Sequence, residues 1–200
     1  MSSQSPSLKL AVASWLYGDK TVGRLLCHYL KERNLRILVL AGNTVSPSLV
    51  EWLAEKCGLR ILGVTGNLDD SSVASALASK GFFLEAGSFQ IENMRLTGMG
   101  LMAGSKEYSD GLSGVATIAV SFLNGRLHRC CSGLSSGIVD EFAEKVGADL
   151  VITGSCPTPC VNGETVSPGF AYLGWVAVVE YSLGGFRIVF ENLRKERLRF

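Results

Sequence analysis

Short apolar runs alternate with amphipathic segments through the first part of the chain. Three continuous apolar runs have the length of buried strands, at residues 8–13, 36–40 and 60–64. Each run ends in a loop rich in Gly and polar residues, and is followed by a stretch with helical spacing of apolar side chains. Helices are expected over residues 21–32, from Pro47 onward, and over 72–80. Three successive strand–loop–helix units predict a parallel sheet whose loops gather at one edge.

The second half of the chain is richer in short strands. Residues 138–146 form one further predicted helix, with Phe142 and Val146 facing inward and Gly147 placed to end it. The remaining apolar runs have β character and lie at residues 82–100, 115–121, 149–153, 171–181 and 186–191. One domain with two sheets fits this pattern better than two separate domains.

Composition indicates an ordinary globular domain. The chain has 200 residues, 47% of them hydrophobic, which suffices for one sizeable core. A net charge of +1 gives no general attraction to nucleic acid or to an anionic membrane. No apolar run approaches the roughly 20 residues that span a bilayer. We expect a single domain over residues 1–200, a loose segment at 1–7, a basic tail at 192–200 and a cytoplasmic location.

Six cysteines are spread irregularly along the chain, at positions 27, 57, 130, 131, 156 and 160. They are too few for a small disulfide scaffold, so we expect mostly buried thiols. A disulfide between loop cysteines is one alternative. A structural zinc site formed by Cys156, Cys160 and the adjacent Cys130 and Cys131 is another. Intracellular disulfides would be plausible in a hyperthermophile.

The loops that follow the predicted strands carry an ordered set of short motifs. In chain order they are Gly42-Asn43, Gly66-Asn67-Leu68-Asp69, Gly154-Ser155-Cys156-Pro157 and Ser167-Pro168-Gly169-Phe170. This order and spacing resemble the calcineurin-like metallophosphoesterases, over roughly residues 8–190. The resemblance implies a four-layer α/β/β/α sandwich of two stacked mixed sheets.

The resemblance also places the family's site positions on this chain. The metal-ligand positions fall on Trp15, Tyr17, Asn43, Asn67, Phe122, Ser155 and Pro157, and the position of the catalytic His falls on Leu68, before Asp69. Of these expected ligands only Asn67 is retained. A bridging carboxylate offsets the repulsion between two cations. Asn43 stands at that position, and its neutral amide cannot do so. The chain has only two histidines, His28 and His128, and neither aligns with a ligand position.

These replacements predict a vestigial cleft with no catalytic residue and no cofactor. Trp15, Tyr17 and Leu68 are expected either to fill the former metal site or to form an exposed apolar patch that binds a protein. We therefore predict a non-catalytic interaction or scaffold module, similar in logic to the small retromer subunit. Its partner would be a protein; a homo-oligomer is also possible, and no membrane partner is expected.

Two alternatives remain open. One is a divergent metal-dependent phosphoesterase or nucleotide-binding protein, in which Asn43, Asn67, Asp69 and Ser155 hold at most one weakly bound divalent metal. The other is association with nucleic acid through the basic tail at residues 192–200, although one short cluster supplies few phosphate contacts.

Overall fold

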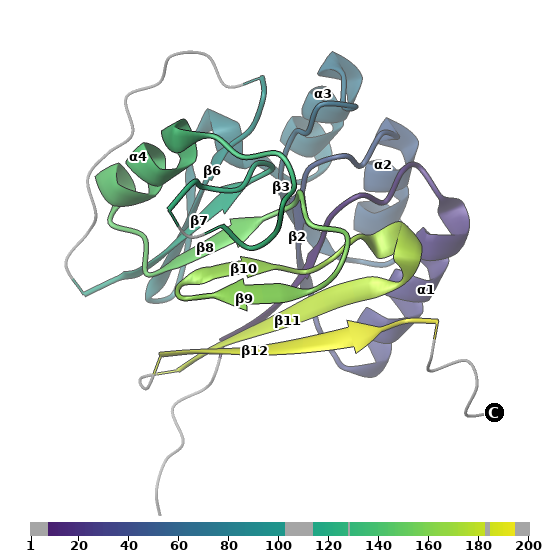
Figure 1. The fold of residues 1–200 in the computed structure, drawn as a ribbon. Helices are drawn as coiled ribbons and strands as arrows, with labels where there is room; N and C mark the ends of the chain where they lie inside the picture. The colour runs from purple at the N-terminus through teal and green to yellow at the C-terminus, as the bar shows by residue number, and fades with distance from the viewer. Residues whose placement is uncertain (1–7, 103–113, 128, 183–184, 195–200) are drawn as a thin grey trace, which may run out of the picture.

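The computed structural model describes residues 8–102, 114–127, 129–182 and 185–194 (Figure 1). The predicted loose segment at 1–7 and most of the predicted tail at 192–200 lie outside these residues. Within the described part of the chain, no helix is long and apolar enough to cross a membrane.

The first sheet contains the three predicted parallel strands. In spatial order its strands are β12 (Gly185–Asn192), β11 (Trp175–Ser182), β1 (Leu8–Ala13), β2 (Ile37–Ala41), β3 (Arg60–Val64) and β4 (Phe82–Phe83). Strands β1 to β4 run parallel, and β11 is antiparallel to β1. Strands β11 and β12 are antiparallel neighbours, and β12 forms one edge of the sheet.

Three helices cover the outer face of this sheet, namely α1 (Lys20–Glu32), α2 (Pro47–Glu55) and α3 (Ser71–Lys80). Each begins at a side chain that accepts hydrogen bonds from the first-turn N–H groups: Asp19, Ser46 and Asp70. Apolar side chains of the helices and the sheet form one continuous core between the two layers.

The second sheet is also mixed and has six strands. In spatial order they are β5 (Ser88–Ile91), β6 (Met94–Met99), β7 (Ala116–Ser121), β8 (Leu150–Thr153), β10 (Thr165–Ser167) and β9 (Cys160–Asn162). Helix α4 (Gly137–Val146) covers its outer face and ends at Gly147, which has a left-handed backbone conformation. Two short 3₁₀ turns, η1 (Leu84–Ala86) and η2 (Ala171–Leu173), lie in the connections.

The two sheets pack face to face over a second apolar core. Leu10, Val39 and Leu62 from the first sheet pack with Leu96 and Val120 from the second, and all five are buried. The order of layers is therefore helices, sheet, sheet, helix, which confirms the predicted four-layer sandwich.

The expectation of free thiols is wrong, because all six cysteines form disulfides. The pairs are Cys27–Cys57, Cys130–Cys160 and Cys131–Cys156. The last two pairs form because β7 and β8 are parallel neighbours, which brings the loops after them side by side. Their thiols are therefore joined to one another and do not provide the four thiolates of a zinc site.

Candidate functional site

The loops after β1 and β2 hold an unusual backbone at the carboxyl edge of the first sheet. Within these two loops, four residues other than Gly have left-handed φ angles: Trp15 (53°), Tyr17 (58°), Asn43 (55°) and Val45 (67°). Such conformations cost of order 1–3 kcal/mol each, and a β-branched residue such as Val is the least suited to them. Strain of this kind persists only where the surrounding structure over-determines it and is typical of functional loops.

Backbone hydrogen bonds between the two loops hold this conformation in place. The N–H of Trp15 donates to the carbonyl oxygen of Gly42 at 3.1 Å, and the N–H of Tyr17 donates to that of Asn43 at 3.2 Å. The N–H of Gly18 donates to the carbonyl oxygen of Thr44 at 2.9 Å. The loops thus continue the pairing of β1 and β2 beyond the sheet.

Two glycines allow the strand ends to approach closely. A Cβ atom at Gly66 would collide with the side chain of Asn43, and one at Gly154 would collide with the carbonyl oxygen of Ala41. Gly154 follows β8 in the second sheet and Ala41 ends β2 in the first. The carboxyl edges of both sheets therefore meet at this point, where the resemblance places its metal site.

Two of the predicted site residues bond directly to each other. The side-chain nitrogen Nδ2 of Asn43 donates to Oδ1 of Asn67 at 3.0 Å, and Oδ1 of Asn43 accepts from the N–H of Leu68 at 2.9 Å. Asn43 is fully buried. Both polar atoms of the Asn43 side chain therefore form hydrogen bonds to the loop after β3.

Asp69 also ties these loops together. Its Oδ2 accepts from the N–H groups of Asn43 (2.7 Å) and Gly66 (2.8 Å), and its Oδ1 accepts from the N–H of Val45 (2.6 Å). Burial raises the pKa of Asp69, and the backbone N–H groups partly oppose that rise because they favour the charged carboxylate. Both carboxylate oxygens are therefore engaged in holding the loops.

A second buried carboxylate lies near Asp69. Oε1 of Glu85 accepts from the N–H of Thr65 at 2.5 Å and from its hydroxyl at 2.6 Å, and Oε2 accepts from the N–H of Met102 at 3.2 Å. Burial raises the pKa of Glu85, and the nearby charge of Asp69 adds to the rise. No sequence motif pointed to this residue, which lies outside the loop motifs.

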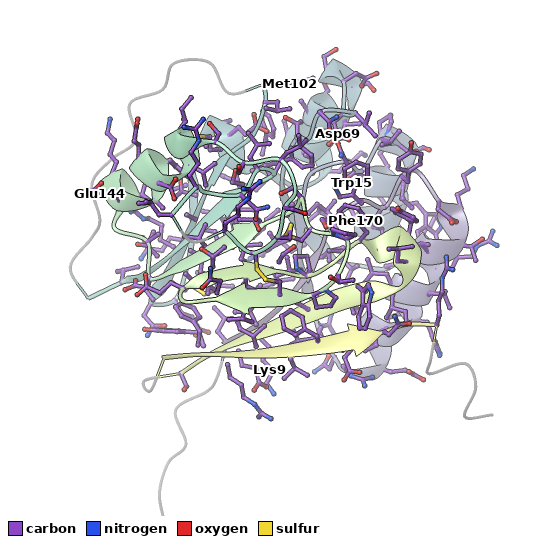
Figure 2. All side chains as sticks on the ribbon, in the orientation of Figure 1. Lys9, Trp15, Asp69, Met102, Glu144 and Phe170 are labelled. Carbon is purple, nitrogen blue, oxygen red and sulfur yellow. A yellow bond between two sulfur atoms is a disulfide. The ribbon has the colours of Figure 1, made fainter. Side chains whose placement is uncertain are left out.

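Aromatic side chains gather around Trp15. The ring centroid of Trp15 lies 4.6 Å from that of Phe170 and 6.1 Å from those of Tyr17 and Phe122. Tyr17 also lies 6.0 Å from Tyr172. Figure 2 shows Trp15 and Phe170 close together on the same side of the molecule as Asp69. Phe170 and Tyr172 were not predicted as site residues, although they directly follow the Ser167-Pro168-Gly169 motif.

The aromatic and apolar side chains at this site differ in how deeply they are buried. Phe122 is fully buried, where it packs against Gly42, and the indole nitrogen of Trp15 is buried without a hydrogen-bond partner. Phe122 therefore fills space between the two sheets, and the partly buried Trp15 packs beside it. Tyr17, Leu68 and Val45 are instead exposed, by 55%, 42% and 37%, and form the outer rim. Phe122 thus fills space at the predicted site, whereas Tyr17, Leu68 and Val45 leave apolar surface exposed there.

Ser155 and Pro157, the last two predicted site positions, form hydrogen bonds within the protein. The hydroxyl of Ser155 donates to the carbonyl oxygen of Leu134 at 3.1 Å and accepts from the side-chain nitrogen of Asn124 at 2.7 Å. Pro157 is exposed, and its carbonyl oxygen accepts from the N–H of Phe170 at 3.2 Å. Asn124 also lies beside the sulfur atoms of Cys131 and Cys156, so this loop is organised around a disulfide.

These residues do not fit a dinuclear metal centre. Across the described residues, no three His, Cys, Asp or Glu side chains gather as a metal site would require. Asn43 and Asn67 offer neutral amides that bond to each other, and both oxygens of Asp69 accept backbone N–H groups. His28 lies on α1 beside Glu32, at 3.1 Å, and His128 lies outside the described residues. No hydrolytic step can be derived from this set.

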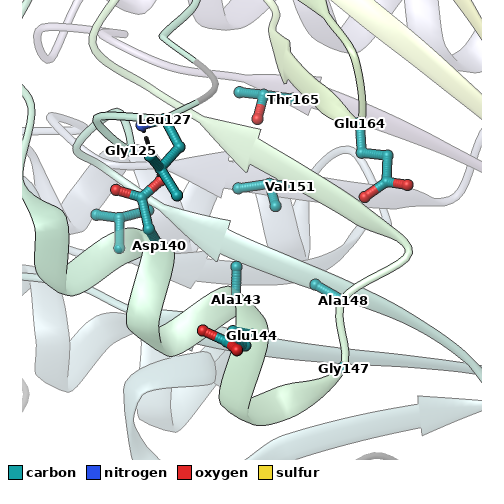
Figure 3. Close-up of a pocket in the computed structure, with 11 residues that line it drawn as sticks. Gly125, Leu127, Asp140, Ala143, Glu144, Gly147, Ala148, Val151, Glu164 and Thr165 are labelled. Carbon is teal, nitrogen blue, oxygen red and sulfur yellow. Dashed lines mark hydrogen bonds between the residues drawn. The ribbon is translucent and has the colours of Figure 1, made fainter.

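A separate pocket of about 430 Å³ lies between α4 and the strands β8 and β10 (Figure 3). Asp140 at its wall accepts from the N–H groups of Arg126 (2.6 Å) and Leu127 (3.2 Å). The carboxylates of Glu144 and Glu164 stand on opposite sides of the pocket in Figure 3, and both residues are exposed. Asp140 thus holds a loop, and the pocket brings no set of catalytic groups together.

Solved structures share this fold, although no protein-family model and no curated protein matches the sequence. A Thermus thermophilus protein has a TM-score of 0.69 at 12% identity, covering 94% of this chain and 100% of that one. A dimetal phosphatase from Danio rerio has a TM-score of 0.65 at 9% identity, with the same coverage. The chain has the calcineurin-like metallophosphoesterase fold.

A third structure of this fold is described differently. GAP50, the anchor in the inner membrane complex of Plasmodium, has a TM-score of 0.66 at 12% identity and covers 98% of this chain and 88% of its own. At such identities the likeness concerns the arrangement of the backbone and not the chemistry of side chains. The metallophosphoesterase fold of this chain is therefore established, and its function depends on the residues of the site.

Proposed function

We propose that this chain is a non-catalytic protein of the metallophosphoesterase fold that acts as an interaction or scaffold module. The observation that carries the proposal is the set of side chains at the loop edge. Phe122 fills space between the sheets beside the partly buried Trp15, and the side-chain nitrogen of Asn43 donates to the side-chain oxygen of Asn67. The loops keep their strained backbone, but the polar side chains of Asn43, Asn67 and Asp69 form hydrogen bonds within and between these loops.

The exposed rim supports a protein as the partner. Tyr17, Val45 and Leu68 project from loops whose backbone is fixed by the contacts described above. Exposed apolar side chains on a rigid backbone lose little conformational entropy on binding, which favours protein recognition. The use of this fold by a Plasmodium anchor is consistent with such a role.

The disulfides bear on the predicted cytoplasmic location. Three disulfides are unusual in the cytosol of a mesophile, where thiols are kept reduced. We therefore propose a cytoplasmic location only for a hyperthermophilic source, and otherwise a compartment that permits disulfides.

Catalysis is tested with the purified protein and its Asn67→Ala variant. We expect no stoichiometric manganese or zinc by elemental analysis, and no metal-dependent turnover of phosphomonoesters, phosphodiesters or nucleotides. The alternative, a divergent phosphoesterase or nucleotide-binding protein with a reduced metal site, predicts turnover or nucleotide binding that is lost in Asn67→Ala. That result would reject the non-catalytic proposal.

The docking surface is tested by identifying a partner and then changing the rim. A pull-down from source cells with mass spectrometry names candidates, and calorimetry with the purified candidate measures affinity. We expect the double variant Tyr17→Ser, Leu68→Ser to weaken binding by at least tenfold. Ile138→Ser removes an apolar side chain on α4 that is more exposed than either Tyr17 or Leu68, and should leave affinity unchanged. Equal affinity of all three proteins would show that the rim is not the docking surface.

A further inference from the structure

Strand β12 is an unprotected edge of the first sheet. It is eight residues long, pairs with β11 without a bulge, and has no other strand beside it among the described residues. Figure 1 shows it at the outer margin of the molecule. Natural edge strands are usually shortened, interrupted by Pro or a bulge, or covered, because their free N–H and C=O groups can pair with another chain. The sequence of β12, Gly-Phe-Arg-Ile-Val-Phe-Glu-Asn, contains no Pro, and its only charged residues are Arg187 and Glu191.

The hydrogen bonds to β11 define which backbone groups face outward. The N–H of Leu193 donates to the carbonyl oxygen of Gly174 at 2.8 Å, one position beyond the pair of Asn192 and Trp175. Because hydrogen-bonded and non-hydrogen-bonded pairs alternate along antiparallel strands, the odd-numbered residues of β12 bond to β11. The N–H and C=O groups of Phe186, Ile188 and Phe190 therefore point away from the sheet.

A row of alternating charges crosses the sheet and ends at this edge. Lys9 on β1 forms an ion pair with Glu180 on β11, and Glu180 lies 3.4 Å from Arg187 on β12. In both cases the two residues are direct cross-strand neighbours. The Arg187 side chain is 77% exposed, so its guanidinium remains accessible for a further carboxylate across the edge.

The other charged residue of β12 supplies that carboxylate when two copies are paired. In an antiparallel pairing of two β12 strands centred on Val189, Arg187 of each copy lies opposite Glu191 of the other. Within its own copy Glu191 lies 3.6 Å from Arg33, and its side chain remains 31% exposed. Pairing centred on Ile188 places Arg187 opposite Val189, and pairing centred on Phe190 places it opposite Leu193. Of these three registers, only the one centred on Val189 forms two ion pairs.

The same register matches the apolar side chains. Ile188 and Phe190 lie on the inner face of β12, pack on the core between the sheets, and are only partly buried. With the centre at Val189, Ile188 of one copy lies opposite Phe190 of the other, and their outward backbone groups form a hydrogen-bonded pair. Backbone geometry, charge and apolar contact thus favour one and the same register.

We propose that this protein forms a two-fold symmetric homodimer through antiparallel pairing of β12 with β12 of a second copy, centred on Val189. The first sheet then continues from one copy into the other. A symmetric contact of this kind is self-complementary and closes after two copies. The dimer surface is formed by β12 and not by the loops around Tyr17 and Leu68, so it stands independently of the proposed function.

Charge reversal tests the dimer and its register together. Sedimentation velocity over a wide concentration range should show the parent protein in a concentration-dependent equilibrium with a species of twice its mass. Arg187→Glu and Glu191→Arg each place like charges opposite each other at two sites, so each alone should raise the dissociation constant by about tenfold or more. An equimolar mixture of the two variants restores both opposite-charge pairs and should form the heterodimer. Lys145→Glu, a charge reversal on α4, should behave as the parent.

A cysteine at the symmetry axis provides a second test. Val189 faces its own counterpart in this register, and the six native cysteines are all paired, so Val189→Cys should cross-link into a covalent dimer on mild oxidation. Arg187→Cys places the thiol opposite Glu191 and should cross-link far less. A monomeric parent at all concentrations, dimers that withstand both charge reversals, or a mixture that stays monomeric would each overturn the proposal.

Discussion

The side chains of Asn43 and Asn67 bond to each other, with Nδ2 of Asn43 3.0 Å from Oδ1 of Asn67. Asn43 also accepts from the N–H of Leu68, so this pair connects the loop after β2 to the loop after β3. Both residues stand where the family resemblance places metal ligands. In this chain they act as a link within the protein, and this changes what their substitution is expected to do.

Asn67→Ala should affect stability. Removal of the acceptor breaks the bond from Nδ2 of Asn43, and because Asn67 is exposed the loss should be that of an ordinary hydrogen bond, about 0.5–1.5 kcal/mol. Urea unfolding followed by circular dichroism measures the difference. Ser75→Ala, on the exposed side of α3, is the control and should change the free energy of unfolding by less than about 0.5 kcal/mol. Equal stability of parent and Asn67→Ala would contradict a structural role for this bond.

Asp69 and its neighbour Asp70 provide a matched pair of variants. Asp69→Asn replaces one acceptor oxygen with an amide donor that faces backbone N–H groups, so we expect a loss of about 2–4 kcal/mol. Asp70→Asn keeps a good helix cap at the start of α3 and should cost only about a few tenths of a kcal/mol. Chemical unfolding of the three proteins side by side provides the comparison. Similar losses in the two variants would show that the carboxylate of Asp69 has no special role.

Glu85 makes stability depend on pH in a direction that can be checked. Its pKa in the folded protein is raised above the ordinary value of 4.5, chiefly by burial. The folded state therefore binds more protons than the unfolded state in that range, so this group's contribution to stability falls as pH rises through it. Glu85→Gln has no such titration. Relative to the parent, the variant should become more stable as pH increases from about 4 towards neutrality.

Urea unfolding of the parent and Glu85→Gln at several pH values measures that trend. Ser75→Ala, which removes no titratable group from the exposed side of α3, is the control and should differ from the parent by a constant amount. A difference between parent and Glu85→Gln that does not vary with pH would show that Glu85 titrates as it does in the unfolded chain.

Reduction of the disulfides should lower stability substantially. Cys27 and Cys57 are 30 residues apart, and closing a loop of that size stabilises by about 3.5 kcal/mol in the chain-entropy description. The double variant Cys27→Ala, Cys57→Ala should therefore unfold at a clearly lower temperature than the parent in calorimetry. Alkylation of the unreduced, denatured parent should modify no cysteine. Labelling of all six thiols would show that the disulfides do not form under the conditions tested.

The repeated pattern of apolar run, glycine loop and amphipathic segment was sufficient to predict the first sheet and its helices. Buried parallel strands such as β2 are apolar along their whole length, and helices such as α1 show a periodic apolar face. The end of α4 at Gly147 was also predicted correctly, since it depends on neighbouring residues alone. The place of β11 and β12 beside β1, and the position of η1, involve contacts between distant segments that local patterns do not encode.

The site likewise combines features that the sequence predicted with features that depend on contacts between distant segments. The ordered loop motifs in the sequence indicated the fold and the positions where metal ligands are replaced, because those depend on residue identity. Only the tertiary structure decided that Phe122 fills the interior while Tyr17 remains exposed, that Asp69 serves backbone N–H groups, and that Cys131 meets Cys156. Each of these outcomes depends on how closely the carboxyl edges of two sheets approach, and that distance is set by packing of the entire core.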